Sequence, residues 1–151
     1  MFWSKKETKT KYSTDLIKKW EGCKLTAYKC PAGKWTIGYG NTTYEDGAPV
    51  KEGDKITQDR AERMLTAYLT KEVYWHLERI GLTDNQISAV SSLIYNVGWG
   101  SFSRSKCWKA MKEKDWGEVY NNWDWIKASG KVMKGLIKRR AEELALFMKD
   151  I

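Results

Sequence analysis

The stretch "KWEGCKLTAYKCPAGKWTIGYGNT", residues 19–42, decides the fold. Apolar residues around Trp20 recur at helical spacing, and Gly22 is suited to end that helix. After Gly22 the helical spacing stops, and residues rich in Thr, Tyr, Trp and Ile surround a turn at Pro31–Gly33. The stretch therefore predicts a short helix followed by a small antiparallel hairpin over about residues 25 to 39.

Helical spacing dominates the rest of the chain. The longest predicted helix, residues 58 to 80, has apolar residues at every third or fourth position. Thr83–Gln86 is a capping box that opens the next helix, and residues 82–151 are expected to be helical. The pattern indicates an α+β fold, mostly α, in which a small N-terminal sheet lobe (about 13–60) is joined by a long helix to a helical C-terminal lobe.

The length and composition fit one domain. The chain has 151 residues, of which 42% are apolar, so it can bury a core. Residues 1–12 are interpreted as a polar arm and 13–151 as a single domain. The chain shows neither a signal peptide nor an apolar run near the roughly 18 residues that span a bilayer. Synthesis in the cytoplasm is therefore expected.

The three cysteines, Cys23, Cys30 and Cys107, are expected to be free thiols, because an odd count without a signal peptide argues against disulfides. The only histidine is His76, and the gap between the first two cysteines is too long for the usual paired spacing of a zinc site. No metal and no cofactor are expected.

The chain carries a formal charge of +8, which suits an anionic partner. Nucleic acid, an anionic membrane surface and anionic cell-wall polymer are the candidates that charge alone leaves open. No nucleic-acid recognition motif is present, and acidic residues are scattered along the chain, so nucleic acid is not the expected partner.

Glu21 is the first candidate for chemistry. It lies four residues after Ile17, on the apolar side of the predicted helix. A carboxyl group there is expected to be partly desolvated, which favours its neutral, proton-donating form. Such a group suits a general acid, whereas the alternative is a surface glutamate at a helix end.

Glu21, eight residues, Cys30, five residues and Thr36 form a pattern that resembles the catalytic pattern of phage-type lysozymes, glycoside hydrolase family 24, also called endolysins. The surrounding "EGCKLTAYKCPAGKWTIGYGNT" follows the family's run E-G-x-x-L-x-A-Y-x-D-x-x-G-x-x-T-I-G-Y-G-x-T. "YNVGWGSF" (95–102) and "GLIKRRAEELALF" (135–147) are similar to later family motifs. The resemblance runs from about residue 13 to 148 and departs from the usual aspartate at Cys30.

The resemblance implies a lysozyme-like two-lobed fold and a muramidase that cleaves the β-1,4 bond between N-acetylmuramic acid and N-acetylglucosamine. It implies Glu21 as general acid, Cys30 and Thr36 as the groups that activate or position water, and Tyr39 and Asn96 as substrate-binding residues. Without the aspartate, two alternatives stay open: a lytic transglycosylase that leaves a 1,6-anhydro product, and a catalytically weak peptidoglycan-binding protein.

The same resemblance implies the partners. Peptidoglycan glycan strands are the expected substrate, and the protein is expected to act as a monomer. Export to the wall or periplasm is expected to depend on a holin, because no signal peptide is seen in the sequence.

Overall fold

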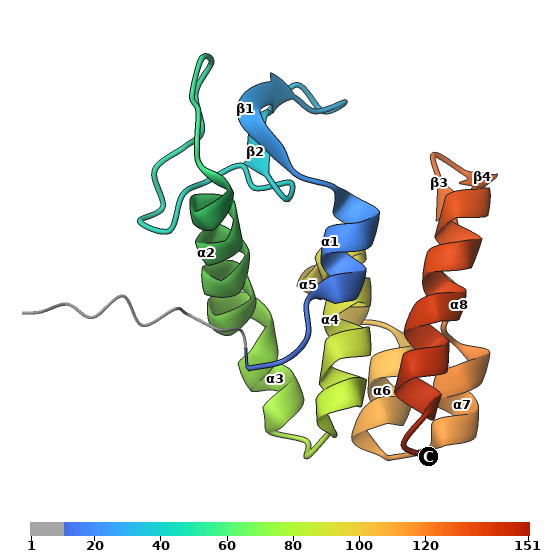
Figure 1. The fold of residues 1–151 in the computed structure, drawn as a ribbon. Coiled ribbons are helices and arrows are strands. Elements are labelled where there is room, and N and C mark those ends of the chain that lie inside the picture. The colour runs from blue at the N-terminus through green and yellow to red at the C-terminus, as the bar shows by residue number, and fades with distance from the viewer. Residues whose placement is uncertain (1–10) are drawn as a thin grey trace, which may run out of the picture. The chain divides into compact units, whose positions relative to one another are not determined.

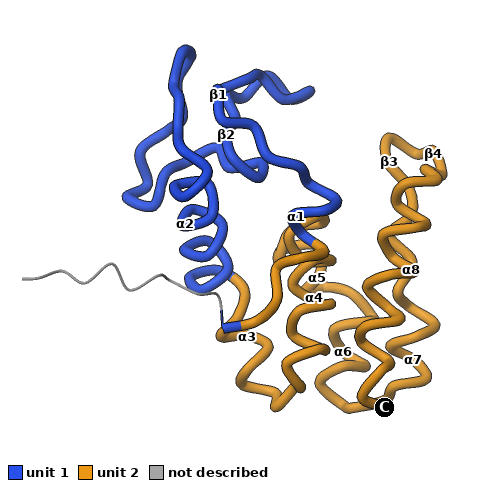
Figure 2. Tube along the Cα trace, in the orientation of Figure 1, with its two compact units in different colours: residues 1–11, 17–72 blue, residues 12–16, 73–151 orange. Residues whose placement is uncertain are grey.

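The computed structural model describes residues 11–151, and it confirms an α+β fold that is mostly α (Figure 1). Its described residues divide into two compact units (Figure 2). The first contains Lys11 and residues 17–72, and the second contains residues 12–16 and 73–151. No helix in the described part of the chain is long and apolar enough to cross a bilayer.

The predicted helix and hairpin are present in the first unit. Helix α1 (Asp15–Glu21) is followed by Gly22, whose φ of 67° lies in the left-handed region that glycine adopts easily. Strands β1 (Lys24–Lys29) and β2 (Trp35–Gly38) pair antiparallel, with Tyr28 opposite Thr36. The hairpin thus places Tyr28 and Thr36, both within the predicted catalytic stretch, opposite each other on neighbouring strands.

A small apolar core holds this hairpin in place. Ile37 of β2, Val50 and Met64 are buried together. Met64 belongs to helix α2 (Gln58–Leu69), which packs against β2 and begins at Thr57, whose side chain accepts a hydrogen bond from the Arg60 N–H. The position of β2 is therefore fixed by α2 as well as by β1.

The long helix predicted over residues 58 to 80 contains a change of helix type. It consists of α2, a π-helical turn (Thr70–Tyr74) and α3 (Trp75–Glu78). The boundary between the two units falls inside the π-helical turn. The predicted apolar stripe is buried as far as Leu77: Ala61, Leu65, Leu69, Val73 and Leu77.

The second unit is mainly helical. Helix α4 (Asp84–Val97) starts with the predicted capping box and packs along α8 (Lys134–Met148). Between them along the chain lie three short helices: α5 (Trp99–Ser103), α6 (Lys106–Lys112) and α7 (Trp116–Asn121).

The expectation that residues 82–151 are helical throughout is wrong at one place. Strands β3 (Lys127–Ala128) and β4 (Lys131–Val132) form a small hairpin. Its turn residues, Ser129 and Gly130, have φ values of 49° and 76°. Two successive positive φ angles belong to the tight turns that join antiparallel strands, and a Ser-Gly pair suits them.

The buried face of α8 also differs from the apolar spacing. The apolar spacing over about residues 134 to 149 predicts that Ile137, Ala141, Leu144 and Met148 are buried. Ile137 and Ala141 are exposed, and the other two are half-buried. The side chains that are buried instead include two arginines and a glutamate: Arg139, Arg140, Glu143 and Phe147. The helix turns this face inward because the three charged groups bind one another there.

The predicted polar arm, residues 1–12, falls mostly outside the described residues. Its last residue, Tyr12, is buried and packs edge-on against Tyr74, with ring centroids 4.8 Å apart. Tyr12 therefore belongs to the packed part of the second unit.

Candidate active site

Glu21, the predicted acid, is the last residue of α1 and its side chain is half-buried. A β-carbon built on Gly40 would lie 3.8 Å from Oε2 of Glu21. The carboxyl group therefore lies close to the backbone that follows β2, where Gly40 has a φ of 91°. This placement agrees with the partial desolvation expected from the sequence.

Cys30 lies in the turn between β1 and β2. The turn is closed by two backbone hydrogen bonds, from the Cys30 N–H to the Lys34 oxygen (2.9 Å) and from the Gly33 N–H to the Cys30 oxygen (2.8 Å). Hydrogen bonds lower the pKa of the Cys30 thiol below its ordinary value, and the backbone N–H of Lys34 contributes most. Burial opposes this shift, while the Ala32 N–H and the Thr36 hydroxyl add to it. The turn thus favours a thiolate without any cationic side chain.

Thr36 is buried on β2 beside the sulfur of Cys30. Its hydroxyl donates a hydrogen bond to the Lys34 carbonyl oxygen at 3.0 Å. A hydroxyl has one proton, so Thr36 cannot donate to this carbonyl and to the Cys30 thiolate at the same time. While the hydroxyl hydrogen of Thr36 points at the Lys34 carbonyl oxygen, the lone pairs of its Oγ1 can accept a hydrogen bond from another group.

Tyr28 is a site residue that the sequence reasoning missed. It is opposite Thr36 in the hairpin, and its side chain is 39% exposed. Burial is the main cause that raises the pKa of Tyr28, and the negative charges of Cys30 and Glu21 raise it further. The phenol of Tyr28 therefore interacts electrostatically with both Cys30 and Glu21. Strand alternation could have identified it, because residues two apart share a face and Tyr28 precedes Cys30 by two.

Tyr39, predicted to bind substrate, is buried in a polar network of the first unit. Its hydroxyl donates to Oε1 of Glu62 (3.1 Å) and accepts from Nε2 of Gln58 (2.9 Å). Burial raises the pKa of Tyr39 to about 12. Glu62 is also bound by Lys18 at 2.5 Å. These contacts hold Tyr39 in place, and its role in substrate binding stays a prediction.

Cys23 borders the same network. Burial raises the pKa of its thiol, and the charge of Glu62 raises it further, against hydrogen bonds from Tyr39 and Gln58. In the described part of the chain no three His, Cys, Asp or Glu side chains are grouped as metal ligands would be.

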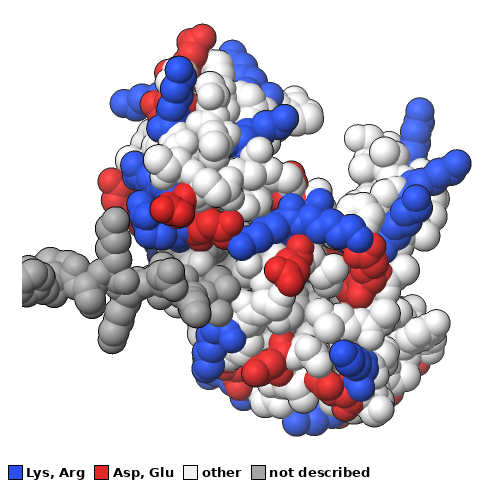
Figure 3. Space-filling view, viewed as in Figure 1, with Lys and Arg blue, Asp and Glu red and all other residues white. Residues whose placement is uncertain are grey.

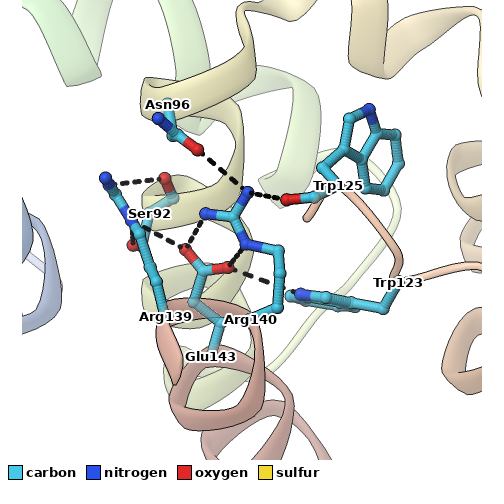
Figure 4. A network of polar contacts seen from close by, with 7 residues as sticks. All are labelled: Ser92, Asn96, Trp123, Trp125, Arg139, Arg140 and Glu143. Atoms are coloured by element: carbon cyan, nitrogen blue, oxygen red, sulfur yellow. Dashed lines mark hydrogen bonds and ion pairs between the residues drawn. The ribbon is translucent and has the colours of Figure 1, made fainter. Parts of the chain in front are cut away.

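Asn96, the other predicted substrate-binding residue, belongs to the second unit, near the end of α4. Its Oδ1 accepts a hydrogen bond from Nη1 of Arg140 at 2.9 Å (Figure 4). The side chain is exposed, so Arg140 orients an amide that solvent reaches. Its role in substrate binding likewise stays a prediction.

Arg140 and Glu143 are the centre of a buried polar network in the second unit (Figure 4). Nε of Arg140 lies 2.6 Å from Oε1 of Glu143, and Nε of Arg139 lies 3.4 Å from Oε2. Arg139 also donates to the Ser92 carbonyl oxygen at 3.0 Å. Burial raises the pKa of Glu143, because desolvation outweighs the attraction of both guanidinium groups. The two arginines and the glutamate therefore pair with one another inside the second unit.

The first unit therefore assembles a half-buried carboxyl group, a thiol with a lowered pKa and a buried hydroxyl within one helix–hairpin segment. A carboxyl group can donate a proton to a leaving oxygen, and a thiolate can accept one from water. This set of groups is suited to acid–base catalysis of a bond cleavage, with Thr36 available to orient a small nucleophile.

Comparisons with known proteins identify the family of the chain. The family model of phage lysozymes matches residues 18–143. An endolysin of Acyrthosiphon pisum secondary endosymbiont phage 1 is 38% identical over 144 residues, which cover 87% of this chain and 92% of the endolysin.

Two solved structures share the fold. The muramidase domain of SpmX from Asticaccaulis excentricus superposes with a TM-score of 0.78 at 31% identity, covering 93% of this chain and 99% of that domain. A P22 lysozyme mutant has a TM-score of 0.73 at 31% identity, covering 91% of this chain and 98% of that structure. The chain therefore belongs to the phage lysozyme family and is a glycosidase of that kind.

Proposed function

We propose that this protein lyses bacterial peptidoglycan by cleaving the β-1,4 bond between N-acetylmuramic acid and N-acetylglucosamine. Membership of the phage lysozyme family supports lysis of peptidoglycan in general. The observation that carries the finer proposal is the position of Glu21, half-buried against Gly40 in the segment that also holds Cys30 and Thr36.

Glu21 acts as the general acid. Cleavage of a glycosidic bond passes through an oxocarbenium-like state, and the departing oxygen needs a proton. The carboxyl group of Glu21 gives its proton to that oxygen as the bond from the anomeric carbon breaks. The half-buried position of Glu21 next to the backbone of Gly40 sets the carboxyl group within the segment that holds Cys30 and Thr36.

Cys30 and Thr36 handle the water. With its own proton donated to the Lys34 carbonyl, Thr36 accepts a hydrogen bond from water and orients it. The thiolate of Cys30 takes the second water proton while the water oxygen bonds to the anomeric carbon. One proton leaves Glu21 and one arrives at Cys30, so the hydrolysis is balanced.

A transglycosylase is the second candidate, because position 30 holds a thiol and not a carboxylate. Only a minor fraction of an ordinary thiol is ionised near neutral pH, so water activation is weaker than with aspartate. The C6 hydroxyl of the muramic acid residue can then attack the anomeric carbon, which leaves a 1,6-anhydro end. If the thiol activates neither water nor the C6 hydroxyl well, the protein is a peptidoglycan-binding protein with weak catalysis.

The substrate-binding residues and the route to the wall complete the proposal. Tyr39 and Asn96 bind the glycan, the protein acts as a monomer, and a holin opens the membrane through which it reaches the wall. The unpaired amide hydrogens of Asn96 suit a sugar hydroxyl, because Arg140 occupies only its oxygen.

The test replaces Glu21 with Gln. Glu21→Gln should lower lysis of purified peptidoglycan by a factor on the order of 10²–10⁴, the usual contribution of a general acid. Glu52→Gln removes an exposed carboxylate of the same unit and should keep full activity. Near-normal turnover by Glu21→Gln would remove Glu21 from the acid role.

The products distinguish the candidates. Mass spectrometry of digested peptidoglycan should show reducing N-acetylmuramic acid ends. Products lighter by one water would establish the transglycosylase instead. If the wild type sediments with purified wall but releases no fragments, the protein is a binder.

A further inference from the structure

The β3–β4 hairpin and the start of α8 carry a surface that the proposed chemistry does not use. We call it the hairpin patch and define it by six exposed residues: Lys127, Lys131, Val132, Met133, Lys134 and Ile137. The three apolar side chains are 53%, 46% and 44% exposed, in the order Val132, Met133, Ile137. Three large apolar side chains this exposed, within six residues of one another, are a candidate interaction surface.

The charge of the hairpin patch has a single sign. No Asp or Glu occurs between residues 125 and 141. No carboxylate among the described residues pairs with its three lysines. Figure 3 shows the end of the hairpin and the adjacent start of α8, at the upper right, with basic and uncharged surface and no acidic surface.

The hairpin is held firmly at its base. The Met133 N–H donates to the Ile126 oxygen at 2.9 Å, and Nη1 of Arg140 donates to the Trp125 oxygen at 3.3 Å. Arg140 itself is fixed by the buried Glu143. The buried network therefore supports the loop that leads into β3, so the apolar side chains are presented on an ordered base.

We propose that the hairpin patch docks the protein on the surface of an anionic lipid bilayer. Lysines attract the negative headgroups, each by an amount that corresponds to about a fivefold change in partition. The apolar side chains enter the boundary between headgroups and acyl chains, where they leave water. An anionic wall polymer would satisfy the lysines, but it offers no hydrocarbon to Val132, Met133 and Ile137, so the bilayer fits both halves of the patch.

The test measures co-sedimentation of the whole protein with two kinds of vesicle: pure phosphatidylcholine, and an equal mixture of phosphatidylcholine and phosphatidylglycerol. Binding should require phosphatidylglycerol. The double variant Lys131→Gln with Lys134→Gln should bind the mixed vesicles about thirtyfold more weakly. Lys106→Gln with Lys109→Gln makes the same change in net charge on α6 and should bind nearly as the wild type does.

A second pair of variants tests the apolar half. Val132→Ser with Met133→Ser should weaken binding about tenfold or more at unchanged charge. Ser is a good residue at the position before α8, so folding should be kept, and circular dichroism checks it. Tyr120→Ser removes an apolar side chain that is 59% exposed on α7 and should have little effect.

Equal binding by the patch variants and their controls would overturn the proposal, as would equal binding of the wild type to both vesicles. If the patch variants instead lose sedimentation with purified peptidoglycan and keep vesicle binding, the patch serves the wall and the lipid proposal fails. None of these outcomes depends on Glu21, so they leave the proposed cleavage untouched.

Discussion

Position 30 shows how much one functional group changes the chemistry of a site. A carboxylate at this position would be ionised at any pH near neutrality, whereas a thiol needs help from its surroundings. The hairpin turn gives that help mainly through backbone N–H groups, that of Lys34 above all. The base is therefore tuned by the conformation of residues 30–36 and not by neighbouring lysines.

Replacement of Cys30 tests whether the sulfur works as a base. Cys30→Asp should keep or raise the rate of lysis, because it supplies a base that is ionised more fully. Cys30→Ala should lower the rate by a factor on the order of a hundred or more. The measurement is kcat/KM on purified peptidoglycan, and equal rates for the three proteins would make position 30 a bystander.

The pH profile provides an independent check on the same residue. A carboxyl group ordinarily loses its proton at lower pH than a thiol, so the active pair of protonated acid and thiolate is a minor species. In that case the alkaline limb of the rate profile, the fall in rate at alkaline pH, reports the pKa of the Cys30 thiol. Cys30→Asp should move this limb to lower pH, and an unchanged limb would argue against the thiolate as base.

At the scale of elements, the hairpin and the helices differ in how well the sequence predicts them. The β1–β2 hairpin was predictable because Pro31–Gly33 is a strong turn signal between strand-forming residues. The β3–β4 hairpin was missed because two-residue strands show no alternation, and only the Ser129-Gly130 pair indicated a turn.

The inward face of α8 was missed for a different reason. Hydrophobic periodicity assumes that buried faces are apolar, but this face is held by Arg139, Arg140 and Glu143. Among the predicted site residues, Glu21, Cys30 and Thr36 belong to one helix–hairpin segment of the first unit, as their spacing in the sequence requires. The electrostatic interaction of Tyr28 with Cys30 and Glu21 depends on the register of the two strands, which cannot be read directly from the sequence.

Loss of the Glu143 charge should destabilise the second unit. Glu143→Gln leaves two buried guanidinium groups without their carboxylate and should cost about 3–5 kcal/mol of unfolding free energy. Glu142→Gln, at the neighbouring and less buried position, is the matched control and should cost less than about 1 kcal/mol. Urea denaturation measures both, and similar values would show that the buried pairing contributes little.

For the whole molecule, we expect stability to fall at alkaline pH, because a buried thiol and a buried phenol must stay protonated in the folded protein. Burial raises the pKa of Cys107 and of Tyr39 to about 12 each. The unfolded chain loses these protons near pH 8.5 and 10, while the folded protein keeps them. The stabilisation is therefore complete below the unfolded values and disappears as pH rises to about 12, at about 1.4 kcal/mol per pH unit for each group.

Urea midpoints measured from pH 7 upward check this expectation. Cys107→Ala should be less stable than the wild type at neutral pH, because it leaves a small cavity among residues that are fully buried. It should lose stability more slowly with rising pH, since one titrating group is gone. Parallel pH dependences for the two proteins would contradict the role given to the thiol.

The three cysteine thiols of this chain lie in unlike surroundings, and this gives the protein a built-in site for selective chemical labelling. The pKa of Cys30 is lowered, whereas those of Cys23 and Cys107 are raised by burial. Electrophiles react with the ionised sulfur, so brief treatment with iodoacetamide at neutral pH should alkylate Cys30 first. Peptide mapping would locate the adduct, and lysis should cease as the adduct forms. A relative with aspartate at this position would be indifferent to the reagent.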